Sequence, residues 1–139
     1  MEKLDYKLSN IYKMIVNLDK SVKRLKRNSD KDDIEYLQDS IVARFNILVE
    51  SSWKLLKLYM EEKGVSDLSG APKDVINKAL QINFLSPEEH KKFLNFISLR
   101  NMASHIYDEP GYLLVVDAAP IVVELTKTIV ERVKLKSQE

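Results

Sequence analysis

Apolar residues near the N-terminus recur with a regular helical spacing, and this pattern constrains the fold more than any other feature of the sequence. The steps between them alternate between four and three residues along Leu4, Leu8, Ile11, Ile15, Leu18, Val22 and Leu25. Such steps place the side chains on one face of an α-helix, with a seam like that of a coiled coil. We therefore predict that the chain starts with a long amphipathic helix.

Few residues interrupt helices in the rest of the chain, because the whole sequence holds only three glycines and four prolines. Polar residues at 28–33 break the first helix. A second helix is predicted from about Asp32 to Lys63, and Gly64 is placed to end it. Its buried side is predicted to hold Ile34, Leu37, Ile41, Phe45, Leu48, Leu55 and Tyr59.

Shorter signals divide the C-terminal half. Near the end of the loop at 66–73, Pro72 suits the first turn of a short helix. The segment SPEEH at 86–90 offers a serine cap, a proline and two glutamates that favour the start of another helix. The segment DEPG at 108–111 interrupts or redirects that helix. A last helix runs to about Lys136, and Pro120 either kinks it or divides a short lead-in from it.

No convincing strand and no internal repeat is found in the sequence, and 139 residues suffice for one domain with a real core. We predict a single domain over 1–139, folded as an all-α, four- or five-helix up-and-down bundle. No apolar run approaches the roughly 20 residues that span a bilayer. No signal peptide precedes the first amphipathic segment. We therefore expect a cytoplasmic protein without a membrane partner.

Several kinds of catalytic site are excluded by composition. The chain has no cysteine, so disulfides, thiol catalysis and thiolate metal sites are absent. His90 and His105 are its only histidines, and neither belongs to a pair with the spacing of a zinc site. The glycines stand apart and form no phosphate-cradling loop. We expect neither a metal nor a cofactor.

Positive charge is concentrated at the end of the first predicted helix, although the formal net charge is only +1. Lys20 precedes a run that contains Lys23, Arg24, Lys26 and Arg27. One interpretation is a solvated helix end, where cations are favourable. The other is a patch that contacts phosphates. The last four residues are therefore candidate RNA contacts.

The segment RNMASHIYDE, residues 100–109, gathers polar side chains directly after an apolar helical run. Asn101 and His105 are four residues apart, hence on one face of a helix, and Arg100 lies about 100° round from Asn101. A fixed cation, an amide and a group that titrates near neutrality are suited to bind a phosphate and move a proton at a ribose hydroxyl. The alternative is that Arg100 and His105 close a helix C-terminus.

Three segments together resemble the HEPN superfamily, and within it the nucleotidyltransferase substrate-binding proteins. That group includes HepT-type toxins encoded beside a minimal nucleotidyltransferase. Residues 100–109 resemble its arginine-asparagine, serine-histidine-x-tyrosine-aspartate-glutamate signature. Residues 71–80 resemble its proline-lysine turn and short helix. Residues 45–59 resemble its second-helix pattern, with Glu50, Trp53, Lys54 and Tyr59 in the expected places.

This resemblance implies a homodimer in which two R-x4-H motifs face each other across one composite cleft, and a metal-independent ribonuclease activity. His105 would act as general base or acid. Arg100 would hold the phosphate and stabilise the charge that develops on it. Asn101 would orient the histidine or the backbone phosphate, and Ser104 would be a further supporting residue.

The resemblance also implies that a partner nucleotidyltransferase, acting as antitoxin, modifies Tyr107. Glu50 and Lys54 are possible cleft residues from the second helix. Alternatively, they are an ordinary i,i+4 pair, and Trp53 is packing. Two other functions stay open: a non-catalytic substrate-binding subunit of a two-component nucleotidyltransferase, and a structural dimerisation module.

Overall fold

The computed structural model describes residues 2–28, 30–103 and 109–138, and its regular structure is entirely helical. The helices are α1 (Glu2–Arg27), α2 (Lys31–Glu62), α3 (Pro72–Gln81), α4 (Pro87–Ala103) and α5 (Glu109–Ser137). No strand occurs in these ranges. The all-α prediction is confirmed, with five helices. None of the described helices is both long and apolar enough to cross a membrane.

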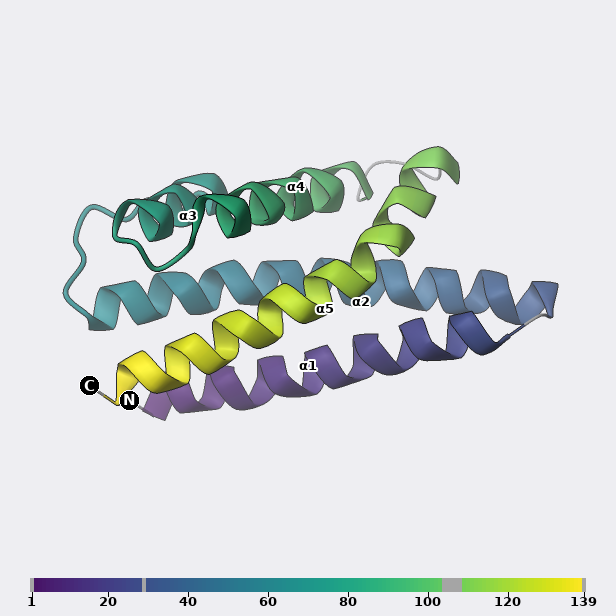
Figure 1. Cartoon of the computed structure of the whole chain (residues 1–139), viewed down its shortest axis with the longest axis horizontal. Helices are drawn as coiled ribbons and strands as arrows, with labels where there is room; N and C mark the ends of the chain where they lie inside the picture. The colour runs from purple at the N-terminus through teal and green to yellow at the C-terminus, as the bar shows by residue number, and fades with distance from the viewer. Residues whose placement is uncertain (1, 29, 104–108, 139) are drawn as a thin grey trace.

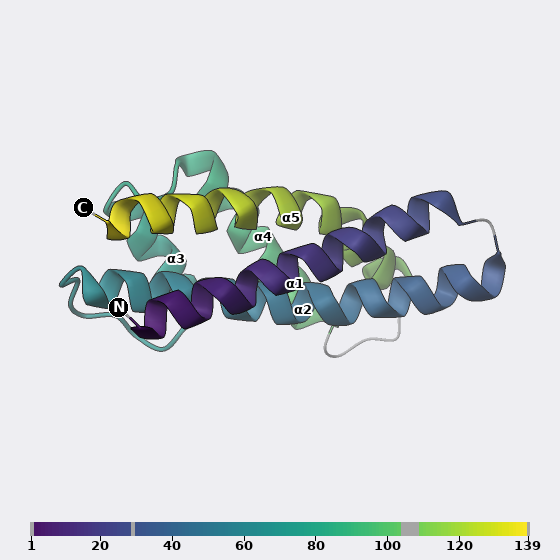
Figure 2. The same ribbon diagram turned by 90° about the horizontal axis from the view of Figure 1, so that it is seen from below.

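The helices form an elongated up-and-down bundle (Figure 1). Helices α1 and α2 run antiparallel beside each other, and α5 packs against both of them (Figures 1 and 2). Helices α3 and α4 cover another side of α2, and α4 also contacts α5. Both chain ends lie at the same end of the bundle. Helix α2 therefore touches every other helix and carries the centre of the fold.

The apolar stripe of α1 lies in the core of its own chain. Its first six members are at most 6% exposed: Leu4, Leu8, Ile11, Ile15, Leu18 and Val22. They pack against α2 and α5. Across α2 and α4, the ring of Phe96 lies edge-on to Phe45 with centroids 6.1 Å apart. The seam that resembled a coiled coil is thus an intramolecular interface, and it gives no reason to expect a dimer.

The predicted signals at Gly64 and Ser86 act at helix ends, and Asp30 is a cap that was not predicted. Asp30 caps α2 by accepting a hydrogen bond of 3.0 Å from the Asp32 main-chain N–H. Gly64, just beyond α2, has a φ of +85°, a conformation that glycine adopts without strain. At the start of α4, the Ser86 hydroxyl accepts from the Glu89 N–H (3.1 Å), and the Glu89 carboxylate accepts from the Ser86 N–H (2.9 Å).

The first turn of α5 contains residues of the DEPG segment. Helix α4 ends at Ala103, and Glu109 and Pro110 already belong to the first turn of α5. A proline fits there because a first-turn N–H has no partner within the helix. Farther on, Pro120 lies inside α5. Figure 1 shows α5 changing direction in its first half, as a proline within a helix is expected to cause.

One ion pair ties the start of α4 to α5. The two terminal nitrogens of Arg132 donate to the two carboxylate oxygens of Glu89 at 2.8 and 3.0 Å. Arg132 also donates to the Phe84 carbonyl oxygen at 2.8 Å. The bonds from Arg132 lower the pKa of Glu89 although burial opposes this, and the bonds to Glu89 raise the pKa of Arg132. This pair fixes the direction in which α4 leads toward Arg100.

Candidate functional site

Arg100 lies in the last turn of α4 and reaches across to the middle of α2. One of its terminal nitrogens lies 3.1 Å from a carboxylate oxygen of Glu50, and the other donates to the Asn101 side-chain oxygen at 3.2 Å. The side chain of Arg100 is 36% exposed. Arg100 therefore joins the end of α4 to α2 through Glu50.

Glu50 is the centre of this cluster. The same carboxylate oxygen that meets Arg100 also accepts a 3.0 Å hydrogen bond from the indole N–H of Trp53, which is 7% exposed. The other oxygen lies 3.3 Å from the Lys54 ammonium group. Burial raises the pKa of Glu50, but the bonds from Trp53 and Lys54 and the charges of Arg100 and Lys54 outweigh it, so the pKa falls below its ordinary value of 4.5.

The predicted i,i+4 pair of Glu50 and Lys54 therefore exists, but it belongs to a larger cluster with Trp53 and Arg100. Two cations surround one carboxylate, which leaves a formal surplus of one positive charge. The buried indole holds the carboxylate, and the carboxylate holds the guanidinium at a partly exposed position. Such an arrangement can present a fixed cation to a phosphate without first ordering a flexible side chain.

Other predicted site residues follow α4 directly. Ser104, His105 and Tyr107 lie outside the described residues, so their predicted roles stay predictions. Asn101 is described and exposed, and its side chain contacts Arg100. Its predicted role of orienting His105 or the phosphate stays a prediction, because His105 is not among the described residues.

The structure brings together part of the predicted basic patch. Lys23, Arg24 and Arg27 line one hollow between α1 and α2, whereas Lys26 is exposed but does not line it. Sequence reasoning missed Arg44 on α2, which lines the same hollow. No local pattern marks Arg44, because its place depends on how the two helices pair.

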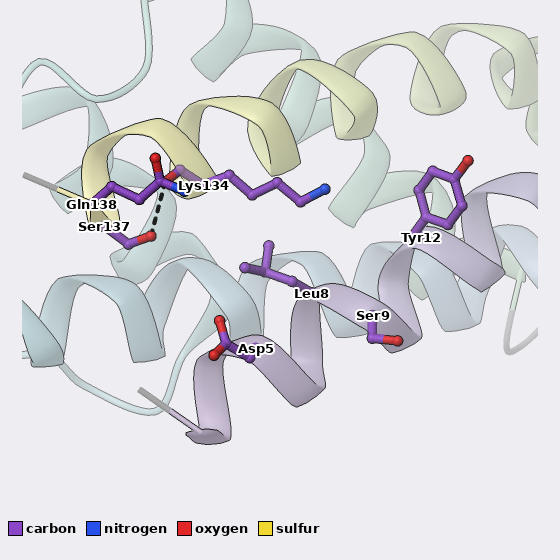
Figure 3. Close-up of a pocket in the computed structure, with 7 residues that line it drawn as sticks. All are labelled: Asp5, Leu8, Ser9, Tyr12, Lys134, Ser137 and Gln138. Carbon is purple, nitrogen blue, oxygen red and sulfur yellow. Dashed lines mark hydrogen bonds between the residues drawn. The ribbon is translucent and has the colours of Figure 1, made fainter.

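Other hollows carry less chemistry. A groove of about 470 Å³ lies between the start of α1 and the end of α5, with Tyr12 at one end and Gln138 at the other (Figure 3). Among the described residues that line it, Asp5 and Lys134 are the charged ones. His90 lies in a shallow depression, where its ring meets the Asn77 side-chain oxygen at 2.7 Å. In the part of the chain that the structure describes, no three acidic or histidine side chains group as metal ligands.

Comparison with protein families gives one match, which covers almost the whole chain. Residues 6–134 match the family described as nucleotidyltransferase substrate binding protein like. No curated protein sequence matches the chain.

Solved structures share the fold. A Thermus thermophilus protein is 24% identical with a TM-score of 0.67, over 84% of this chain and 98% of the other. The tri-AMPylated HEPN toxin of Shewanella oneidensis, solved in complex with an MNT antitoxin, is 19% identical with a TM-score of 0.69, over 90% and 96%. A toxin–antitoxin complex with AMP-PNP is 17% identical with a TM-score of 0.68, over 88% and 96%. The helical arrangement described above is therefore the HEPN fold.

Proposed function

The chain belongs to the family of nucleotidyltransferase substrate binding proteins, and on this premise we propose that it is the toxin of a toxin–antitoxin pair, a metal-independent endoribonuclease acting in the cytoplasm. The observation that carries the proposal is that Glu50 anchors Arg100, the first residue of the R-x4-H sequence, at a partly exposed position. The chain is similar in fold to a HEPN toxin that was solved in complex with an antitoxin, and this similarity supports the proposal that the chain also pairs with an antitoxin.

Cleavage would proceed by attack of the ribose 2′-hydroxyl on the adjacent phosphorus. His105 takes the proton from the hydroxyl as its oxygen bonds to phosphorus. The bond to the 5′-oxygen breaks, and that oxygen leaves with a proton supplied by a second acid, for which the His105 of a second copy is suited. The product ends are a 2′,3′-cyclic phosphate and a 5′-hydroxyl. Arg100 binds the phosphate and stabilises the negative charge that builds on its oxygens.

Glu50 acts through Arg100 as a positioning residue. A carboxylate that stays ionised at neutral pH keeps the guanidinium in one place, and Trp53 keeps the carboxylate in place. An incoming phosphate competes with Glu50 for the guanidinium, but Lys54 remains as a second partner for Glu50. Arg100 can therefore exchange part of its pairing for the substrate at low cost.

The antitoxin in this proposal is a minimal nucleotidyltransferase that modifies Tyr107. The tyrosine oxygen attacks the α-phosphorus of a nucleoside triphosphate, pyrophosphate leaves, and the phenolic proton passes to a base of the partner enzyme. The phosphodiester anion then lies near Arg100 and His105, where the RNA phosphate binds, so cleavage stops. The AMPylated state of the Shewanella oneidensis toxin supports this step.

One experiment tests the proposed activity. Purified protein is incubated with RNA and a chelator, beside Arg100→Ala/His105→Ala, and the ends of the products are mapped. We expect cleavage with cyclic phosphate ends by the natural chain and none by the double variant. Absence of cleavage by the natural chain, with stable binding to a nucleotidyltransferase, would favour the alternative of a non-catalytic substrate-binding subunit, which the family description also fits.

A further inference from the structure

A basic hollow of about 410 Å³ lies between the second half of α1 and the first half of α2. The Arg100 cluster, in contrast, is formed by α2 and α4. Its lining residues are Asn17, Lys20, Ser21, Lys23, Arg24, Arg27 and Arg44, which include five cations and no carboxylate. The four α1 cations fall in pairs three or four residues apart, at 20/23, 20/24, 23/27 and 24/27, which places them on one side of the helix. This side of the bundle thus attracts anions.

Arg44 is held in place within this hollow. Its terminal nitrogen donates to the Asn17 carbonyl oxygen at 2.9 Å and to the Ser21 hydroxyl at 2.6 Å. Ser21 is 3% exposed, whereas Arg44 itself is exposed. A guanidinium fixed in this way has already lost much of its side-chain freedom, so binding an anion costs less entropy than it would for a free arginine.

Most of the positive charge in the hollow is uncompensated. Lys23 lies 2.9 Å from the Asp19 carboxylate, so its charge is largely neutralised. Among the described contacts, no carboxylate pairs with Lys20, Arg24, Arg27 or Arg44. The hollow therefore offers enough charge for more than one phosphate group, and it suits a polyanion better than a single small anion.

An exposed aromatic ring lies beside the cations. A smaller hollow of about 220 Å³ shares Arg24 with the basic hollow and is also lined by Asn28, Asp33, Tyr36 and Leu37. Tyr36 is 75% exposed, the highest value among the large apolar and aromatic side chains of the described residues. The carboxylate of Asp33 makes this smaller hollow unsuitable for a phosphate. The exposed ring of Tyr36, however, can stack against the face of a nucleobase.

We propose that the two adjoining hollows bind single-stranded RNA away from the cleavage site, with backbone phosphates against Arg24, Arg27 and Arg44 and a base stacked on Tyr36. The identity of the nucleic acid as RNA rests on the proposed function. Alternation of cations and an aromatic ring is the means by which proteins hold single strands without reading their sequence. An anionic membrane would need cations around an exposed apolar face, whereas these cations line a concavity.

The test measures binding of a fluorescent single-stranded oligoribonucleotide to Arg100→Ala/His105→Ala, in which the hollows are intact and cleavage is removed. In this background, Arg24→Ala/Arg27→Ala is compared with Lys73→Ala/Lys91→Ala, which removes equal charge from exposed positions on α3 and α4. We expect the first pair to weaken binding about ten-fold and to lower the slope of log affinity against log salt by about 1.4, because each phosphate contact in a single strand contributes about 0.7. If the two double substitutions weaken RNA binding equally, the proposal is wrong, because the loss of net charge alone would explain both results.

The role of Tyr36 is tested in the same background. Tyr36→Ala should weaken binding by at least about five-fold, while Tyr36→Phe retains it, because the ring and not the hydroxyl stacks on the base. Tyr6→Ala is the control, since Tyr6 is 71% exposed at another place on the surface. An equal loss for Tyr6→Ala would contradict stacking at Tyr36.

Two further outcomes separate this inference from the proposed function. If the natural chain cleaves RNA but the variants of the hollow bind as tightly as the parent, the second binding surface is wrong and the ribonuclease stands. If the hollow binds RNA and the natural chain never cleaves it, the ribonuclease is wrong and the binding surface stands. A third outcome concerns membranes. If Arg24→Ala/Arg27→Ala binds phosphatidylserine vesicles less tightly than its parent but binds RNA equally well, the hollow is a membrane-binding surface and the inference is wrong.

Discussion

Arg100 shows how one side chain depends on residues that are distant in the sequence. Its guanidinium is partly exposed, yet Glu50 holds it from another helix and Trp53 holds Glu50. In isolation, a surface ion pair contributes little stability, with typical values of about 0–1 kcal/mol. The cluster is therefore better explained by the need for a fixed cation than by stability of the fold.

The role of His105 can be isolated with a matched variant of the other histidine. We expect His105→Ala to lower RNA cleavage by roughly 10²–10⁴-fold, the usual contribution of a general acid or base. His90→Ala should leave cleavage unchanged, because His90 contacts Asn77 near the α3–α4 junction. The measurements are cleavage rate and thermal melting. A large fall in melting temperature for His105→Ala, with cleavage retained, would instead favour a helix-closing role.

Tyr107 is predicted to be the residue that a partner nucleotidyltransferase modifies. Co-expression of the two proteins followed by peptide mass spectrometry should find nucleotidyl groups on Tyr107, and the modified protein should no longer cleave RNA. The exposed tyrosines Tyr6, Tyr12 and Tyr36 serve as internal controls, since each is more than half exposed. Modification of Tyr36 in place of Tyr107 would mean that exposure, and not recognition of the motif, selects the target.

At the scale of elements, the ion pair of Glu89 and Arg132 is predicted to make the packing of α4 on α5 sensitive to acid. The pKa of Glu89 is lowered in the folded protein, so its stabilising effect is complete above the ordinary value of 4.5 and is lost as the pH falls through the folded value. Glu89→Gln should therefore lose about 1.5–3 kcal/mol of unfolding free energy at pH 7. The difference from the natural chain should shrink as the pH falls below 4.5 and through the lowered pKa of Glu89.

The neighbouring Glu88 provides the control for this measurement. It forms an i,i+4 pair with Lys92 at 3.3 Å, and its side chain is 79% exposed. Urea unfolding of Glu88→Gln should differ little from that of the natural chain at any pH, because exposed pairs contribute little. If both variants lose the same stability at pH 7, the bidentate contact of Glu89 with Arg132 has no special role in joining the helices.

For the whole molecule, we predict a homodimer that completes the cleavage site. The α1 stripe cannot mediate it, because that stripe is buried within the chain. Exposed apolar residues near the motif are better candidates: on α5, Leu113, Leu114 and Ile121 are 40–53% exposed. Sedimentation at micromolar concentration should give twice the chain mass of 16.1 kDa.

Leu114→Glu should convert this dimer to a monomer and abolish cleavage, since burying a charge in an interface is costly. Leu135→Glu is the matched control at the far end of α5, where Leu135 is 67% exposed, and it should leave both properties unchanged. A monomeric Leu114→Glu protein that still cleaves RNA would disprove the shared cleft.

Local signals in the sequence are sufficient to predict the helices and their main boundaries. Periodic apolar residues, caps such as Ser86 and the glycine at the end of α2 act within a few residues along the chain, so they can be read without knowledge of the fold. The Glu50/Lys54 pair is equally local, since its two residues are four positions apart. The role of Pro110 could not be predicted from local signals, because a proline suits a first helical turn as well as an interruption.

Only the tertiary structure decided which of these residues meet. It joined Arg100 to Glu50 and Trp53, added Arg44 to the cations of α1, and buried the α1 stripe within one chain. A periodic apolar face looks the same in sequence whether it packs on its own chain or on another, because burial of apolar surface has no direction and depends only on area. The partners of a charged side chain likewise depend on how helices pair across the bundle, and residues 50 positions apart, as Glu50 and Arg100 are, carry no local signal of their contact.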